Sequence, residues 1–210
     1  MIHEEEEKEK DKSKYKIEYL GEKFSKDLRS HKIIIIGSYG VGKTTITNKI
    51  VYKEFEQEFI PTMDIKNSQI KVNDKIIQIN IWDCCGNDKY ALNIPNLYKN
   101  VSLAILVYAI NDRKSYKELE NLYAILKEHY LDTIIFLIGN KSDLEKEREV
   151  KIEDAEKFKN NYDDIKMFFE TSALNGNNID KLLDNIAISI YEKDKIEENE
   201  ENKAIRKKMQ

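Results

Sequence analysis

The sequence predicts a three-layer α/β fold, in which helices cover both faces of a mostly parallel sheet with one antiparallel edge strand. Short apolar runs alternate with amphipathic stretches along the chain, and this alternation is typical of successive βα units. Strands in parallel sheets are covered on both faces and therefore read as nearly continuous apolar runs. Such runs occupy residues 33–36, 76–82, 103–110, 134–138 and 167–169.

The antiparallel strand is predicted from a hairpin signal. Ile70 and Val72 precede the turn residues Asn73 and Asp74, and apolar residues then alternate with more polar ones over residues 76–82. We therefore expect the strand that contains Ile70 to pair antiparallel with residues 76–82 at one edge of the sheet.

Two stretches carry apolar side chains at spacings of three and four, which places these side chains on one helical face. The first stretch has Tyr116, Leu119, Leu122, Tyr123 and Leu126, and the second has Ile179, Leu182, Leu183, Ile186 and Ile190. Each predicts an amphipathic helix packed against the sheet.

The 210 residues suffice for one compact domain with a hydrophobic core. We predict a charged N-terminal extension over residues 1–30, a domain over residues 31–192 and a charged tail over residues 193–210. The tail, and residues 1–16 of the extension, hold too few apolar side chains to offset the entropy of ordering.

A further apolar stripe lies inside the extension. Ile17, Leu20, Phe24 and Leu28 recur at spacings of three and four, which predicts a short helix. A helix packed onto the domain is the favoured interpretation, and a helix that binds a partner is the alternative.

Composition indicates which kinds of partner and which cellular compartment to expect. The chain has 35 Lys and Arg against 39 Asp and Glu, a net charge of −4, which gives no reason to expect nucleic acid as a partner. Its two cysteines, Cys84 and Cys85, are adjacent and poorly placed for a structural disulfide. No apolar run approaches the roughly 18–20 residues that span a bilayer, and no signal peptide is recognisable. We therefore expect a cytoplasmic protein.

Residues 37–44 match G-x-x-x-x-G-K-[ST], directly after an apolar strand and before a helical stretch. In such a P-loop the backbone N–H groups and the helix N-terminus cradle phosphate. Lys43 is expected to reach the β- and γ-phosphates, and the Thr44 hydroxyl to bind Mg²⁺. The predicted nucleotide-binding set of this loop is Ser38, Tyr39, Gly40, Val41, Gly42, Lys43, Thr44 and Thr45. A glycine-rich turn without a ligand is the alternative, and the loop alone does not distinguish ATP from GTP.

The base is predicted by a second motif. Asn140, Lys141, Ser142 and Asp143 form N-K-x-D after the strand 134–138. An ionised Asp143 accepts hydrogen bonds from guanine N1–H and the N2 amine, two donors that adenine lacks. In isolation the motif would also fit a solvated loop; behind a strand and downstream of a P-loop it favours guanine.

With these two motifs in this order, residues 31–192 resemble the small GTPases, and residues 81–83 and 97–108 are most similar to Rab proteins. The resemblance implies the G domain of the P-loop NTPases, with GTP or GDP and Mg²⁺ as cofactors. It also implies that residues 170–173 form the last guanine-contacting loop, in which the Ala173 N–H donates to guanine O6; Ser172 and Leu174 are further predicted nucleotide-binding residues.

The resemblance further implies two switch segments. In the first, Phe55 stacks against the base, and Thr62 caps the γ-phosphate and binds Mg²⁺. In the second, Asp83 holds Mg²⁺ through water and the Gly86 N–H contacts the γ-phosphate. The partners implied are effectors, exchange factors and GTPase-activating proteins (GAPs).

Two departures from the family pattern bear on hydrolysis, for which Asn87, Lys43 and Thr62 are the predicted catalytic residues. Asn87 stands where the family has a Gln that orients water, and an amide retracted by about 1.5 Å could cost on the order of 10²-fold in rate. Tyr39 stands where the arginine of a GAP would enter. We therefore expect slow hydrolysis.

The two remaining departures concern the first switch and the anchor. Met63 and Asp64 replace the family's Ile-Gly. The sequence ends in Lys207, Lys208, Met209 and Gln210 without a prenylatable cysteine. We expect no lipid anchor, and membrane contact that is weak or made through partners.

The favoured hypothesis is a Rab-like switch that binds GTP and GDP with Mg²⁺, hydrolyses GTP slowly and acts in vesicle-mediated or intracellular transport. A non-hydrolysing GTP-binding scaffold subunit is the alternative. A P-loop ATPase or nucleoside kinase would leave Asn140, Asp143 and Ala173 unexplained.

Overall fold

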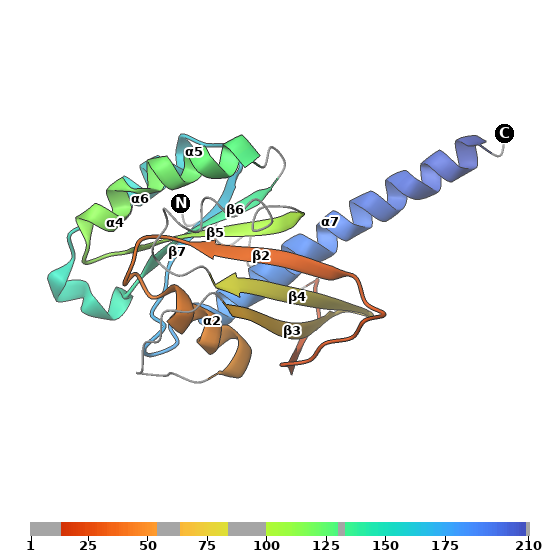
Figure 1. The fold of residues 1–210 in the computed structure, drawn as a ribbon, viewed down its shortest axis with the longest axis horizontal. Helices are drawn as coiled ribbons and strands as arrows, with labels where there is room; N and C mark the ends of the chain where they lie inside the picture. The colour runs from red at the N-terminus through yellow and green to blue at the C-terminus, as the bar shows by residue number, and fades with distance from the viewer. Residues whose placement is uncertain (1–13, 54–63, 84–99, 130–132, 209–210) are drawn as a thin grey trace.

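The computed structural model describes residues 14–53, 64–83, 100–129 and 133–208, in which helices lie on both faces of a seven-stranded sheet (Figure 1). The strands are β1 (Ile17–Gly21), β2 (Ser30–Ile36), β3 (Asp64–Val72), β4 (Lys75–Asp83), β5 (Val101–Ala109), β6 (Ile134–Asn140) and β7 (Ile165–Glu170). The helices are α2 (Lys43–Tyr52), α4 (Arg113–Lys117), α5 (Leu119–His129), the 3-10 helix η1 (Ser142–Glu147), α6 (Ile152–Asn160) and α7 (Ile179–Lys208). The predicted three-layer α/β architecture is confirmed.

The strand order is β1-β3-β4-β2-β5-β6-β7. Strands β4, β2, β5, β6 and β7 run parallel to one another. Strand β3 is antiparallel to β4 across a turn at Asn73, which has a φ of 54°. The predicted hairpin and its antiparallel strand are therefore present, and β1 pairs along the outer side of β3.

The residues of β2 show why the sheet needs cover on both faces. Ile33 and Ile35 pack into the cluster formed with α2 and α7, whereas Ile34 and Ile36 pack into the cluster formed with α5 and α6. All four are at most 2% exposed. Because alternate side chains of a strand point to opposite faces, this continuous apolar run fixes β2 at the centre of the sheet.

The predicted helix of the N-terminal extension is wrong for the residues that form β1. Ile17, Glu18 and Tyr19 pair antiparallel with Val72, Lys71 and Ile70 of β3. The Lys16 N–H also donates to Asn73 Oδ1 at 2.9 Å, and the Asn73 N–H donates to the Lys16 carbonyl at 2.8 Å. The open edge of β3 supplies backbone partners that the local helical spacing did not reveal, and part of the predicted extension thereby joins the domain.

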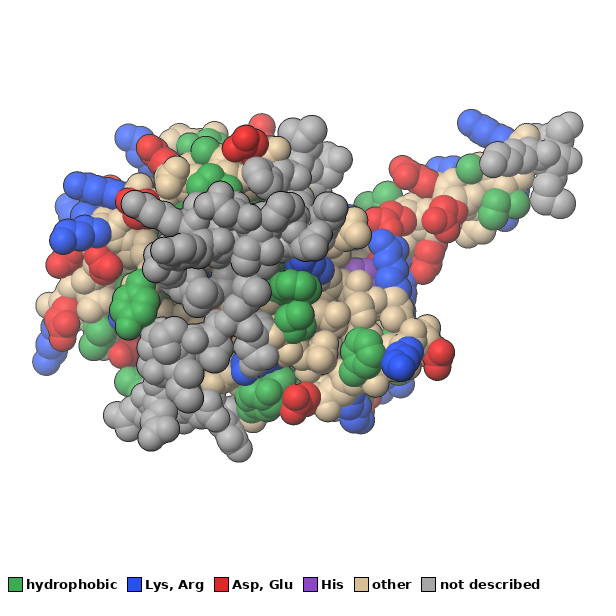
Figure 2. Space-filling model, in the orientation of Figure 1, with side chains coloured by type: hydrophobic (Ala, Val, Ile, Leu, Met, Phe, Trp, Pro, Cys, Tyr) green, Lys and Arg blue, Asp and Glu red, His purple; other side chains and the backbone are tan. Residues whose placement is uncertain are grey.

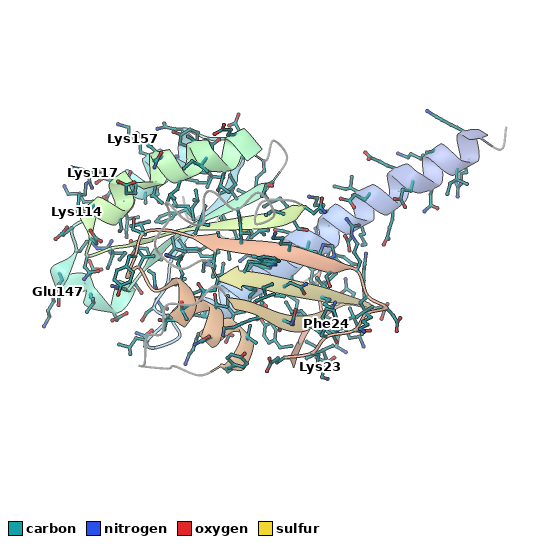
Figure 3. All side chains as sticks on the ribbon, in the orientation of Figure 1. Lys23, Phe24, Lys114, Lys117, Glu147 and Lys157 are labelled. Atoms are coloured by element: carbon teal, nitrogen blue, oxygen red, sulfur yellow. The ribbon has the colours of Figure 1, made fainter. Side chains whose placement is uncertain are left out.

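The linker between β1 and β2 folds back over the sheet through one buried amide. Gln78 of β4 is fully buried, donates to the Ser25 carbonyl at 3.1 Å and accepts from the Ser25 N–H at 2.6 Å. It also contacts Ser30 Oγ at 2.5 Å and Gln69 Nε2 at 3.0 Å. Phe24 of this linker (Figure 3) is 56% exposed and buries little apolar surface, so the polar contacts of Gln78 hold the linker.

The prediction that the C-terminal tail is unordered is wrong for residues 193–208. They continue α7 as one helix that projects from the body (Figure 1). Asp194 is 3% exposed and lies 2.7 Å from Lys75 Nζ, 3.4 Å from His31 Nε2 and 3.5 Å from Arg29 Nη1. This buried ion cluster anchors α7 where it leaves the sheet. Beyond it, acidic and basic side chains line the projecting part (Figure 2). No helix within the described ranges is long and apolar enough to cross a membrane.

The buried His31 predicts a pH dependence of stability. Burial lowers the pKa of His31 below its usual value of 6.5, aided by Arg29 and Lys75 and opposed by Asp194 and Glu197. The folded state therefore favours the neutral imidazole, so the free energy of unfolding should be constant above about pH 6.5 and fall as the pH drops below it. Urea unfolding between about pH 8 and pH 5 tests this. A His31→Gln variant should lose less stability over that interval, since the carboxylates titrate equally in both proteins; equal losses would refute the assignment.

Candidate nucleotide-binding site

The loop between β2 and α2 requires glycine at three positions. A Cβ atom on Gly37 would lie 2.1 Å from the Val107 carbonyl oxygen of β5, so the loop passes directly against that strand. Gly40 and Gly42 have φ values of 77° and 95°, in the left-handed region that glycine adopts at little cost. The loop is thereby turned back over the end of β2.

The N-terminus of α2 suits a bound anion. Its N-cap, Gly42, provides no side-chain cap, and the first turn contains no acidic residue. A helical bond runs from the Ile46 N–H to the Gly42 carbonyl at 2.9 Å, and the N–H groups of the first turn of an α-helix point out of its N-terminal end. Lys43 is buried, and its ammonium donates to the carbonyls of Gly37 and, at 2.9 Å, Ser38. Uncapped donors beside a cation fit a phosphate group.

Two predicted Mg²⁺ ligands lie at this end of the sheet. Thr44 belongs to the first turn of α2, and the fully buried Asp83 ends β4 opposite Ile35 of β2. Hydroxyl and carboxylate oxygens are ligands that Mg²⁺ prefers. The donor set fits the ion, and the assignment of Thr44 and Asp83 as ligands stays a prediction.

The side chain of Asn140 joins the phosphate loop to the last predicted base loop. Asn140 is 2% exposed, and its Nδ2 donates to the Val41 carbonyl at 2.8 Å. Its Oδ1 accepts from Thr171 Oγ1 and from the Ala173 N–H, each at 3.2 Å. A Cβ on Gly42 would lie 2.3 Å from Nδ2, so a glycine is needed for this approach. The Ala173 N–H, which is predicted to donate to guanine O6, donates to Asn140 Oδ1 here, so O6 would have to replace or share this acceptor.

The two base loops are also joined directly. Ser172 Oγ donates to Asp143 Oδ1, and the Ser142 N–H donates to the Thr171 carbonyl at 3.0 Å. Lys141 adopts a left-handed conformation, with φ of 66°, between Asn140 and η1. Asp143 is therefore presented at the end of β6 beside the loop that follows β7.

Behind these loops lies an ion cluster that the sequence did not reveal. Arg148 Nη1 and Nη2 donate to the two carboxylate oxygens of Glu170 at 2.6 and 2.7 Å, and Nε and Nη2 donate to those of Glu145 at 2.8 and 2.6 Å. A fifth bond joins Nη1 to the Val150 carbonyl at 2.9 Å. Five bonds match the five N–H donors of a guanidinium. Because Glu170 directly precedes Thr171 and Glu145 lies two residues after Asp143, Arg148 holds both base loops together.

Tyr108 supports the same region from the core. It is fully buried at the end of β5, and burial raises the pKa of its phenol, which therefore stays neutral. A Cβ on Gly139 would lie 2.6 Å from its hydroxyl oxygen. Gly139, which directly precedes Asn140, therefore leaves room for the Tyr108 ring. The glycine at this position is the sequence feature that could have indicated the close approach of Tyr108.

Most predicted site residues converge at the carboxyl ends of β2, β4, β6 and β7, where ligands of open α/β sheets bind. Val41, Asn140 and Ser172 are buried there, whereas Tyr39 is 64% exposed and Leu174 is 53% exposed. The rest of the described set is Ser38, Gly40, Gly42, Lys43, Thr44, Thr45, Asp83, Lys141, Asp143 and Ala173. The predictions for Phe55, Thr62, Gly86 and Asn87 lie outside the described residues.

This fold and these loops define a P-loop nucleotide-binding domain. Residues 32–192 match the model of the Ras family. Ras-related protein Rab-11B of Dictyostelium discoideum is 34% identical over 163 residues, which cover 76% of this chain and 73% of that protein. The chain therefore belongs to the Ras family of GTP-binding, GTP-hydrolysing switch proteins and is Rab-like, as its motifs indicated.

The cluster around Arg148 predicts a loss of nucleotide affinity when it is removed. Arg148→Met leaves two carboxylates beside each other without their cation, so the base loops should separate and GDP affinity should fall by about tenfold, as measured by titration of a fluorescent GDP. Arg113→Met is the matched control, because the Arg113 guanidinium pairs with Asp154 of α6 and not with Glu145 or Glu170. Equal affinity of the two variants would show that Arg148 does not position the loops.

Proposed function

We propose that this protein is a Rab-like guanine-nucleotide switch that binds GTP and GDP together with Mg²⁺ and acts in vesicle-mediated or intracellular transport. The observation that carries guanine specificity is the joining of three loops: Asn140 links the phosphate loop to Ala173, and Asp143 is bonded to Ser172. These bonds support a guanine site in which the Asp143 carboxylate would accept from N1–H and the N2 amine, and the Ala173 N–H would exchange Asn140 Oδ1 for guanine O6.

The phosphate end of the site would be formed by α2. Lys43 and the N–H groups of its first turn would bind the β- and γ-phosphates, and Thr44, Thr62 and Asp83 would hold Mg²⁺, which neutralises the phosphate charge. Phe55 would stack on the base and Gly86 would contact the γ-phosphate. The GTP form would then be the one that effectors recognise, with exchange factors and GAPs controlling the cycle.

We further propose that the protein works in the cytoplasm and reaches membranes through its partners. The support is the resemblance of its motifs to Rab proteins and its similarity to a Rab protein.

Guanine selectivity should depend on the carboxylate of Asp143. Competition of GDP and ADP for a fluorescent GDP should show strong preference for GDP, and Asp143→Asn should lower GDP affinity by on the order of 10²-fold while xanthine nucleotides gain affinity. The amide reverses one hydrogen-bond polarity, and xanthine supplies the matching acceptor. Asp112→Asn, at the N-cap of α4, is the control and should leave selectivity unchanged. Equal binding of ADP and GDP by the unmodified protein would refute guanine specificity.

Hydrolysis should be limited by Asn87 and Tyr39. Asn87→Gln should raise single-turnover GTP hydrolysis, by up to on the order of 10²-fold, because the longer amide brings water nearer the in-line position. Stimulation by an arginine-supplying GAP active on Rab proteins should appear only when Tyr39→Gly is added, whereas Tyr39→Phe, which keeps the ring, should not permit it. An unmodified protein that already hydrolyses GTP as fast as the double variant would contradict both assignments.

A further inference from the structure

The N-terminal strand contacts the far end of the phosphate-binding helix. Lys53 follows the last residue of α2 and has a φ of 61°. Its ammonium lies 4.4 Å from the centre of the Tyr19 ring of β1 and forms an ion pair with Asp180 of α7. A cation over an aromatic face is held by the ring's negative electron density. Tyr19 therefore joins β1 to the end of α2.

Tyr19 is itself fixed by α7. Its hydroxyl donates to the Asp184 carboxylate and lies 3.4 Å from the Asp180 carbonyl. Burial and Asp184 raise the pKa of the Tyr19 phenol, so the hydroxyl remains a donor. The ring thus stands between α7, which holds its hydroxyl, and Lys53, which lies over its face.

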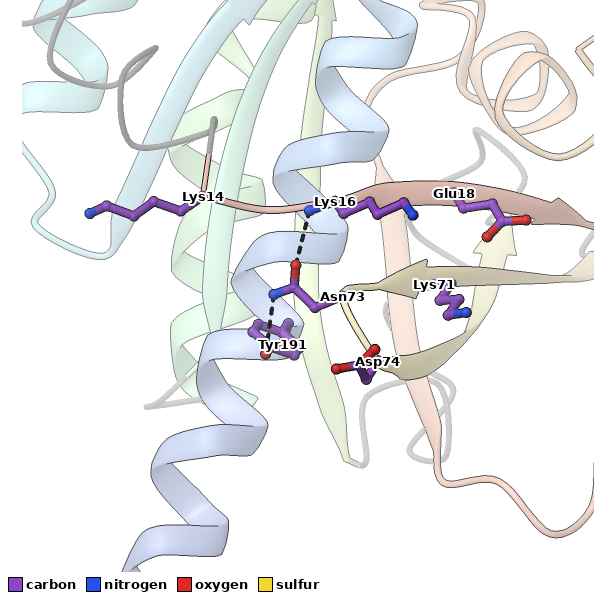
Figure 4. A pocket seen from close by; sticks show the side chains of 7 residues that line it. All are labelled: Lys14, Lys16, Glu18, Lys71, Asn73, Asp74 and Tyr191. Atoms are coloured by element: carbon purple, nitrogen blue, oxygen red, sulfur yellow. Dashed lines mark hydrogen bonds between the residues drawn. The ribbon is translucent and has the colours of Figure 1, made fainter.

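A second tyrosine, Tyr15, lies just before β1 and contacts α7 further along that helix. Tyr15 donates to Glu192 at 2.6 Å, and its ring meets that of Tyr191 edge-on with centres 5.9 Å apart. Four strand residues span about 13 Å and the eight helix residues from Asp184 to Glu192 about 12 Å, so the two contacts match along β1 and α7. Beside Tyr15, Asn73 bridges the Lys16 backbone and Tyr191 (Figure 4).

We propose that Tyr19 is a positioning residue for the bound guanine nucleotide, because it holds Lys53 and thereby fixes the C-terminal end of α2. The N-terminal turn of the same helix carries Lys43 and Thr44, and α2 spans only ten residues. A short helix moves as a rigid rod, so displacement of one end shifts the phosphate-binding donors at the other, where small misplacements are costly. The inference rests on the proposed nucleotide site.

Tyr19 lies outside the segment that matches the Ras family model, which begins at residue 32. The contact therefore comes from the N-terminal extension of this chain and adds a means of control over nucleotide retention. Detachment of β1 from α7 would remove the aromatic contact of Lys53, leave it only its ion pair with Asp180, and hasten nucleotide release.

The test is the rate at which a fluorescent GDP leaves the full-length protein in excess GTP and Mg²⁺. Tyr19→Leu removes both the ring face and the hydroxyl and should release GDP about two- to fivefold faster, the range expected for one cation–π contact. Tyr19→Phe keeps the ring over Lys53 and should release more slowly than Tyr19→Leu. Tyr15→Leu is the matched control, since it weakens the same strand at its other end, and should release GDP as the unmodified protein does.

A second variant approaches the contact from α2. Lys53→Met leaves Tyr19 and Tyr15 in place but removes both the ring contact and the ion pair with Asp180, so it should accelerate release at least as much as Tyr19→Leu, and the double variant should be no faster than Lys53→Met alone. If Tyr19→Leu does not fold, Lys53→Met decides alone. Unchanged release by these variants, or equal acceleration by Tyr15→Leu, would overturn the inference. An unmodified protein that binds no GDP would instead refute the proposed function.

Discussion

The buried amide of Asn140 is the interaction on which the site depends. Its Nδ2 holds the phosphate loop through the Val41 carbonyl, and its Oδ1 holds Thr171 and the Ala173 N–H. A buried amide that lost these partners would leave polar atoms without hydrogen bonds, at a cost of several kcal/mol in total, on the order of 1–3 kcal/mol for each. The three loops are therefore held in one arrangement by the requirement to satisfy a single side chain.

Around this amide, the base side and the phosphate side are stabilised differently. On the base side, Arg148 donates all five of its N–H groups to Glu145, Glu170 and the Val150 carbonyl, so the protein itself orders the loops. On the phosphate side, the helix N-terminus lacks a side-chain cap and an acidic residue in its first turn. Such a terminus is stabilised by an added anion. The base loops are thus prearranged, whereas the helix terminus gains most from the ligand.

The described fold extends beyond the segment that matches the Ras family. Strand β1 covers part of the β3 edge, which would otherwise offer unpaired backbone groups to another chain. Helix α7 continues past the sheet because Asp194 is held by Lys75, His31 and Arg29. The N-terminal addition also packs along α7, where Tyr15 and Tyr19 reach Glu192 and Asp184 inside the matched segment.

The sequence by itself determined the five parallel strands, the hairpin and the P-loop and N-K-x-D motifs, because continuous apolar runs such as 33–36 and glycines such as Gly42 act through local geometry. Only the tertiary structure decided that residues 17–21 form a strand, that residues 193–208 stay helical and that Arg148 orders the base loops. The first two outcomes depend on partners 50 or more residues away, such as Val72 for Ile17 and Lys75 for Asp194. The third depends on the fold bringing Glu170 of β7 beside Arg148. Local periodicity carries no information about such contacts, and their burial outweighs local propensity.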